Sequence, residues 1–216
     1  GMLEAVGNNA VRGYEDDDNV RYFFHAIFDT PFESTGTAYR DSVVPGSASA
    51  RGKKITLFVN YIFPKARTVG VKIGISYVSL EQAEQNVNKE IPNWGFDAIK
   101  DRARTIWNET LGKIKVEGGT EKQRRIFYTA LYRSHERMVN ISEYGKYYSG
   151  FDKKVHDDGG KDFYVDDWLW DTYRSLHALQ MLLDPAKKLN MIRSYVRMYE
   201  QGGWVPSFPL LKGDHP

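Results

Sequence analysis

The chain has 216 residues, of which 41% are hydrophobic and 27% charged, the balance of an ordinary globular protein. Its net charge of +2 gives no basic field that would attract nucleic acid, so we expect no nucleic-acid partner. The absence of cysteine excludes disulfides, thiolate metal sites and cysteine nucleophiles. No apolar run approaches the ~20 residues that a membrane-spanning helix needs, so we expect no membrane span.

The first part of the chain has the pattern of β-structure. Residues 20–29 alternate, with one clearly apolar face, and residues 54–63 form a second predicted strand. Residues 69–78 place Val, Val, Ile, Ile and Tyr against Gly, Lys, Gly, Ser and Val. Strands joined by short turns without helices favour an antiparallel sheet with one solvated face. Residues 1–80 are therefore predicted to be a portion of an antiparallel β-sandwich.

Residues 81–118 are predicted to form a helical linker. The stretch from Leu80 to Ile91 is polar and compatible with a helix. Residues 94–111 carry apolar side chains at helical spacing, and Gly112 follows where a helix would end. Residues 113–117 are short and β-like.

Residues 119–216 have helical patterns. The predicted helices cover residues 121–140, 169–183 and 186–201. Thr120 and Gln123 form a capping box, and Asp184-Pro185 supplies a cap followed by proline at the first helical position. Helices joined by long glycine-rich loops resemble the helix pairs of an (α/α) barrel. The predicted fold class is therefore α+β, a sandwich portion followed by the first helices of an incomplete barrel.

One run of residues, 166–174, combines three Asp and two Trp residues just before and inside a predicted helix. Carboxylates accept paired hydrogen bonds from vicinal sugar hydroxyls, and an indole covers the C–H face of a sugar ring. Arg174 would orient a carboxylate one turn away. The alternative is that Asp167 or Asp171 caps the helix while the Trp side chains lie in the core. Physical chemistry alone slightly favours this capping interpretation.

A second run, 199–209, places Trp204 after a Gly-Gly break and among prolines, which predicts a stiff loop with an aromatic tip. Glycine is also routine at helix ends, so the motif is only moderately specific. The tail adds a carboxylate, Asp214, and an imidazole, His215. No zinc-protease motif, EF-hand, P-loop or Rossmann fingerprint occurs, and no metal ligand is predicted in this chain.

Five segments together resemble glycoside hydrolase family 92, in this order and at similar spacing. They are residues 90–94 (EIPNW), 116–120 (VEGGT), 127–132 (FYTALY), 170–174 (WDTYR) and 198–204 (MYEQGGW). The resemblance covers most of the chain from about residue 20. It implies an N-terminal β-sandwich on a C-terminal (α/α)6 barrel, with the active site between them. It also implies a calcium-dependent, inverting exo-α-mannosidase, usually exported by bacteria.

The resemblance implies that this chain is a fragment of such an enzyme. The family segments that carry the general acid and base do not occur here, so no catalytic residue is expected and the chain alone should be inactive. The calcium ligands are expected outside the chain. The substrate contacts that carry over are Trp170, Asp171, Arg174, Trp204, Asp214 and His215.

The expected partner is a mannose-containing glycan, with terminal α-1,2-linked mannose as the expected substrate. Exposed apolar stripes on an incomplete barrel lead us to expect a homodimer or association with the rest of the protein. A periplasmic or secreted location is expected from the resemblance alone. The segment Gly1–Glu4 itself has no signal-peptide pattern. One alternative stays open, a carbohydrate-binding or assembly module without turnover. The five ordered segments argue against a different (α/α)6 hydrolase or phosphorylase such as a glucosidase.

Overall fold

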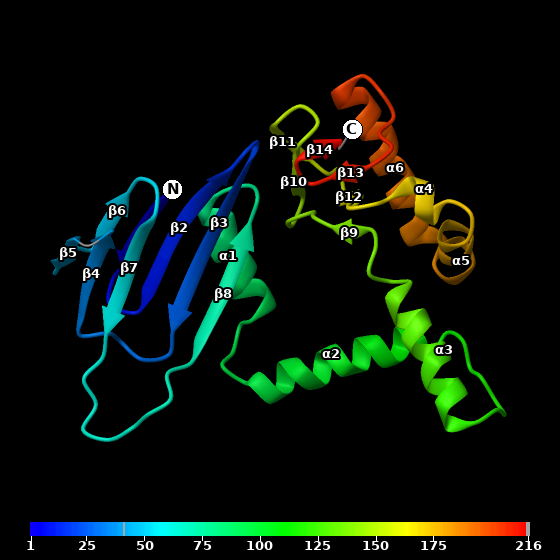
Figure 1. Cartoon of the computed structure of the whole chain (residues 1–216). Coiled ribbons are helices and arrows are strands. Elements are labelled where there is room, and N and C mark those ends of the chain that lie inside the picture. The colour runs from blue at the N-terminus through cyan, green and yellow to red at the C-terminus, as the bar shows by residue number, and fades with distance from the viewer. Residues whose placement is uncertain (41, 215–216) are drawn as a thin grey trace. The chain divides into compact units, whose positions relative to one another are not determined.

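The computed structural model describes residues 1–40 and 42–214. The chain forms two compact units, Gly1–Trp94 and Gly95–Pro216. Figure 1 shows the strands and single helix of the first unit in blue to green, and the helices and short strands of the second in green to red. The α+β class, with antiparallel sheets followed by helices, is confirmed.

The first unit contains two antiparallel sheets. The larger sheet has the strand order β6-β1-β2-β3-β8, and the smaller has the order β5-β4-β7. The strands are β1 (Met2–Val6), β2 (Ala10–Asp17), β3 (Val20–Phe28), β4 (Ser34–Tyr39), β5 (Ser42–Pro45), β6 (Ser49–Arg51), β7 (Ile55–Asn60) and β8 (Val71–Ser76). The three strands expected from alternation correspond to β3, β7 and β8, whereas β1 and β2 precede the first of them.

Helix α1 (Leu80–Glu90) packs on the larger sheet, against β8 and β3. Ser79 caps it by accepting a hydrogen bond from the Gln82 amide. The contact with β8 requires glycine at position 74, because a Cβ there would lie 2.3 Å from the Ala83 carbonyl oxygen. This packing buries the polar face of β8. The side chains of Lys72 and Ser76 are buried, whereas those of Val71, Ile73 and Ile75 are exposed.

One face of the strand is solvated, as expected, but it is the apolar face, whereas such alternation usually places the polar face in solvent. Lys72 is accommodated because its ammonium group donates to the Ile91 carbonyl oxygen at 2.9 Å and lies 4.8 Å from the centre of the Trp94 ring. The long side chain thus reaches the C-terminal end of α1, where the Ile91 carbonyl accepts a hydrogen bond from the ammonium group.

The second unit combines helices with short two-stranded sheets. Its helices are α2 (Phe96–Leu111), α3 (Glu121–Arg133), α4 (Leu169–Thr172), α5 (Leu176–Leu183) and α6 (Pro185–Gly202). Its strands are β9 (Val139–Asn140), β10 (Lys146–Ser149), β11 (Lys154–Asp157), β12 (Tyr164–Val165), β13 (Pro209–Leu210) and β14 (Gly213–Asp214). The predicted caps are present: Thr120 and Gln123 form the capping box of α3, and Asp184 caps α6.

Three predicted segments differ from the structure. The helix expected over 121–140 ends at Arg133, because Val139–Asn140 pairs with β12 as strand β9. The helix expected over 169–183 is broken between α4 and α5. Its Thr172 hydroxyl bonds to Asp167 and to the Trp168 carbonyl, which are local bonds that compete with helix continuation.

The β-like stretch 113–117 is irregular. The Tyr128 hydroxyl donates to the Ile114 carbonyl and accepts from the Val116 amide, so a side chain satisfies backbone groups that a neighbouring strand would otherwise pair.

The core of the second unit includes a buried cluster of Met138, Tyr164 and Met191, against which Tyr195 packs.

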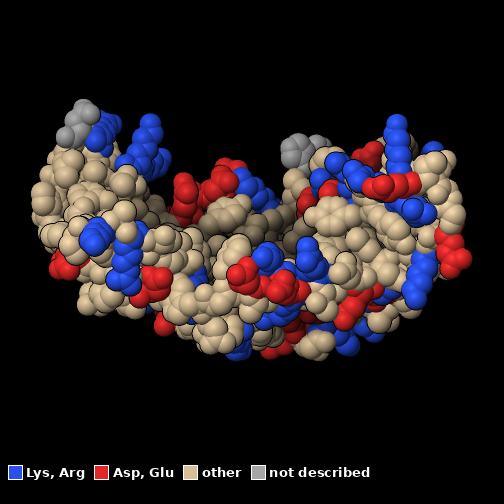
Figure 2. Space-filling model, turned by 90° about the horizontal axis from the view of Figure 1, so that it is seen from below, with Lys and Arg blue, Asp and Glu red and all other residues tan. Residues whose placement is uncertain are grey.

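Acidic and basic side chains are interspersed over the face that Figure 2 shows. None of the helices in the described part of the chain is long and apolar enough to cross a membrane.

Candidate functional site

The segment of residues 166–174, here called the Trp170 loop, follows β12 and contains α4. Its start is hydrogen-bonded to the first residue of β13 and to the stretch just before that strand. The amides of Asp166 and Asp167 donate to the Pro209 carbonyl at 2.8 and 3.2 Å, and the Leu169 amide donates to the Ser207 carbonyl at 3.3 Å. Two sequence motifs that lie about 40 residues apart are thereby brought side by side.

Asp167 is fully buried beneath this loop, and its carboxylate accepts four hydrogen bonds. One oxygen accepts from the Trp168 amide at 2.9 Å and from the Thr172 hydroxyl at 2.8 Å. The other accepts from His177 Nε2 at 2.8 Å and from the Tyr195 hydroxyl at 2.6 Å. The carboxylate therefore joins α4, α5 and α6 at one point.

These bonds control ionisation. Burial by itself raises the pKa of Asp167, but hydrogen bonds from His177, Tyr195 and Thr172 outweigh it and lower that pKa to about 2. The pKa of Tyr195 is raised, first by burial and then by its bond to the Asp167 carboxylate. At neutral pH the pair is therefore an ionised carboxylate and a neutral phenol.

Above this buried group, Trp170 and Asp171 face solvent. Trp170 is 78% exposed, its ring lies 6.1 Å from that of Tyr173, and Asp171 is also exposed. Arg174 Nε donates to the Tyr173 hydroxyl at 2.6 Å, and its guanidinium lies over the same ring. Arg174 thus contacts an aromatic residue, whereas the sequence suggested that it orients a carboxylate.

Capping does not explain these aspartates. Trp168 occupies the N-cap position of α4, and no side chain caps this helix. Asp171 lies within α4, whereas Asp167 precedes Trp168. Neither Trp168 nor Trp170 is a core residue.

The second region, residues 203–214, is here called the Trp204 hairpin. Gly203 ends α6 in the left-handed conformation with φ of 86°, which favours glycine. Trp204 is 56% exposed, and its indole N–H donates to Asp214 at 3.3 Å. The same carboxylate accepts from the Phe208 amide at 2.8 Å. The structure therefore joins two of the predicted residues, Trp204 and Asp214, while His215 lies outside the described residues.

An aromatic contact links the two regions. The rings of Trp168 and Phe208 are stacked with centroids 5.4 Å apart. The guanidinium of Arg137 lies 3.8 Å from the centre of the Trp168 ring and pairs with Asp166 at 2.5 Å. Four exposed aromatic residues, namely Trp168, Trp170, Tyr173 and Trp204, thus belong to one connected set of loops.

Sequence reasoning missed the residues that support this surface: Arg137, His177 and Tyr195. Arg137 lies between α3 and β9, His177 on α5 and Tyr195 on α6, and no short spacing connects them to Asp166 or Asp167. Only Thr172, five residues after Asp167, offers a local signal, because a hydroxyl one turn along can reach back to an acidic residue.

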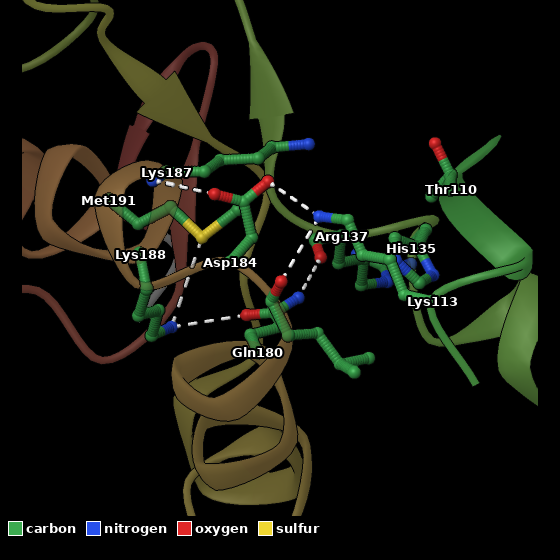
Figure 3. Close-up of a pocket in the computed structure, with 10 residues that line it drawn as sticks. Thr110, Lys113, His135, Arg137, Gln180, Asp184, Lys187, Lys188 and Met191 are labelled. Carbon is green, nitrogen blue, oxygen red and sulfur yellow. Dashed lines mark hydrogen bonds and ion pairs between the residues drawn. The ribbon is translucent and has the colours of Figure 1, made fainter. Parts of the chain in front are cut away.

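A separate cavity of about 90 Å³ lies between the ends of α2, α5 and α6, and contains none of the predicted site residues. Figure 3 shows Lys113 reaching Asp184 and the ammonium group of Lys188 held by Gln180 and Met191. Lys113, Asp184 and Lys188 already have protein partners, and we assign no sugar contact to this cavity.

The calcium implied by the resemblance requires clustered oxygen ligands. Within residues 1–40 and 42–214, no group of three His, Asp or Glu side chains could hold a metal ion. The residues present therefore do not fit a complete calcium site.

Known proteins provide three comparisons. A fungal protein from Arthroderma benhamiae, described as an uncharacterized secreted glycosidase, is 35% identical over 80 residues, covering 35% of this chain and 10% of that protein. An inverting family-92 mannosidase from Bacteroides thetaiotaomicron superposes with a TM-score of 0.86 at 26% identity, over 100% of this chain and 30% of the other. A family-92 α-mannosidase from Bacteroides thetaiotaomicron gives 0.89 at 21% identity, over 99% and 30%, which supports the fold alone.

The chain thus spans about a third or less of the length of the relatives it matches. Residues 82–215 match the family described as the glycosyl hydrolase family 92 catalytic domain. This match covers more than half of the chain, and the chain therefore belongs to glycosyl hydrolase family 92.

Proposed function

We propose that this chain supplies part of the sugar-binding surface of an exo-acting α-mannosidase. The enzyme would remove terminal mannose from glycans with inversion, with α-1,2-linked mannose as its substrate. Family membership supports a glycosidase, and one structural relative is an inverting mannosidase. A secreted relative also supports export, to the periplasm or the medium.

The observation that carries the proposal is the exposure of Trp170 beside Asp171 on a loop anchored from below. The indole offers an apolar face to the C–H groups of a mannose ring, and the carboxylate can accept hydrogen bonds from two neighbouring hydroxyls. Arg174, Trp204 and Asp214 would extend this surface, and we propose the same role for His215.

The proposed role is binding rather than proton transfer. Inverting hydrolysis needs a carboxylic acid and a carboxylate base ~6.5–9.5 Å apart. Asp167 cannot be the acid, because a group with a pKa of about 2 is ionised at neutral pH, and its burial keeps it from a bound sugar. We assign neither role to a residue of this chain and propose that the chain alone does not hydrolyse mannosides.

Because the described residues do not fit calcium, no step of the reaction is assigned to it. We propose that its ligands lie outside this chain. We also propose that the exposed apolar surfaces of the chain contact a second copy or the rest of the protein.

The test is a titration of the chain with methyl α-mannoside, followed by tryptophan fluorescence. We expect saturable binding that Trp170→Ala weakens by about tenfold, since an aromatic platform is worth roughly 1–1.5 kcal/mol. Phe96→Ala is the matched control, because Phe96 is 76% exposed on α2 and lies outside the proposed surface. Equal affinity of wild type and Trp170→Ala would contradict the proposed site.

The second candidate is a carbohydrate-binding module without turnover. The buried, ionised Asp167 favours it, because the loop offers binding groups without a carboxylic acid in reach. Release of mannose from an aryl α-mannoside by the purified parent enzyme would support the mannosidase and exclude this candidate.

A further inference from the structure

The Asp167 carboxylate has a role that the sugar-facing residues do not explain. It is a fully buried charge whose two oxygens each accept two hydrogen bonds. A buried ion is a poor way to gain stability, because desolvation offsets much of the attraction, whereas well-packed apolar residues would serve as well. What four directional bonds do supply is a fixed geometry for the groups that make them.

Two of those groups, the Trp168 amide and the Thr172 hydroxyl, belong to the Trp170 loop itself, and the other two lie on α5 and α6. Asp167 precedes Trp168, and its bond to Thr172 spans the whole of α4, from before its start to its last residue. Helix α4 has four residues and no side-chain cap, so it has little helical stability of its own. The directions of Trp170 and Asp171 therefore depend on the anchor beneath them.

The anchor is itself held by longer elements. His177 belongs to α5, and Tyr195 belongs to the 18-residue helix α6 and packs against the buried cluster of Met138, Tyr164 and Met191. The carboxylate thus connects the loop to a long helix that packs against this cluster. Residues that hold the binding side chains in place in this way set the precision of a binding site.

We propose that Asp167 is a positioning residue that holds Trp170 and Asp171 in the geometry that receives a mannose ring, acting through Thr172 and Tyr195. The inference rests on the proposed function for its ligand. It assigns to the buried network part of the affinity of the site, because a loop with several orientations binds only through the fraction that has the right one.

The sharpest test compares two tyrosines of the same cluster. Tyr195→Phe removes one bond to Asp167 and keeps the ring, whereas Tyr164→Phe removes a hydroxyl that contacts Asp162 instead. Both proteins are labelled with 5-fluorotryptophan, and the resonances of Trp168 and Trp170 are assigned by single Trp→Phe variants. Measurements are made under conditions in which both variants are fully folded.

We expect Tyr195→Phe to broaden or shift the Trp168 and Trp170 resonances and to weaken methyl α-mannoside binding about tenfold, as when the competent fraction falls to about a tenth. Tyr164→Phe should leave both unchanged. Unchanged resonances at positions 168 and 170 in Tyr195→Phe would overturn the inference, as would equal effects of the two variants.

Asp167→Asn is the stronger variant and should show larger changes of the same kind, but its folding is not required. If the wild-type chain does not respond to the mannoside, the proposed function fails, while the fluorine resonances still decide whether Asp167 positions the loop.

Discussion

The Trp170 loop and the Trp204 hairpin each present an exposed tryptophan close to a carboxylate, but they are built by different means. The loop depends on a buried charge with four donors, whereas the hairpin depends on backbone devices: a left-handed Gly203 and the fully buried Pro206 and Pro209. In the loop the nearby carboxylate, Asp171, is exposed, and in the hairpin Asp214 is bonded to the indole itself. The stability of a loop held by a buried charge depends on pH and falls when the charge is replaced by an isosteric neutral group. The stability that a glycine or proline backbone conformation provides does not depend on pH.

The largest expected effect comes from removing the charge at position 167. Asp167→Asn keeps the shape but turns an amide toward the donors of His177 or Tyr195, and a buried unsatisfied donor costs about 1–3 kcal/mol. We expect the free energy of unfolding to fall by about 3 kcal/mol in a urea titration at pH 7. The exposed neighbour provides the control: Asp171→Asn should change it by less than about 0.5 kcal/mol.

The next effect is pH dependence. The pKa of Asp167 is depressed from its ordinary value to about 2, so its contribution is fully present above about pH 4 and is lost as the pH falls toward 2. A shift of this size corresponds to about 2 kcal/mol. Unfolding should therefore be measured in wild type and Asp167→Asn between pH 2 and pH 6. The difference between them should shrink with acidification, and a constant difference would exclude an ionised Asp167 as its source.

The smallest effect tests the hairpin. Gly203→Ala places a Cβ on a residue with φ of 86° and should cost about 1 kcal/mol, although no atom crowds that position. Since the substitution itself changes no ionisable group, the cost should be the same at pH 4 and at pH 7 in thermal unfolding. A cost that varies with pH would show that the hairpin also depends on charge.

The same distinction explains what the sequence could predict. The capping box at Thr120, the Asp184-Pro185 start of α6 and its glycine end are local, and each was predicted within a residue or two. The exposed Trp170 could be suggested by its motif alone. The Asp167 network could not, since Tyr195 lies 28 residues further along and meets Asp167 only after α5 and α6 pack.

The buried face of strand β8 could not be predicted for a related reason. Its alternation is clear, but periodicity does not say which face α1 covers. Here the glycine at position 74 permits close approach of α1 to the face of β8 that carries Lys72 and Ser76.

That strand also bears on how the chain behaves in solution. Within the described residues, β8 ends the five-stranded sheet, so one side of its backbone has no ladder partner, and its outward side chains are Val71, Ile73 and Ile75. Lysine often protects such a border, but Lys72 is buried and cannot do so. The strand therefore offers an apolar edge at which neighbouring molecules can associate. Sulfate and phosphate strengthen apolar association, so we expect aggregation first in concentrated samples that contain these salts.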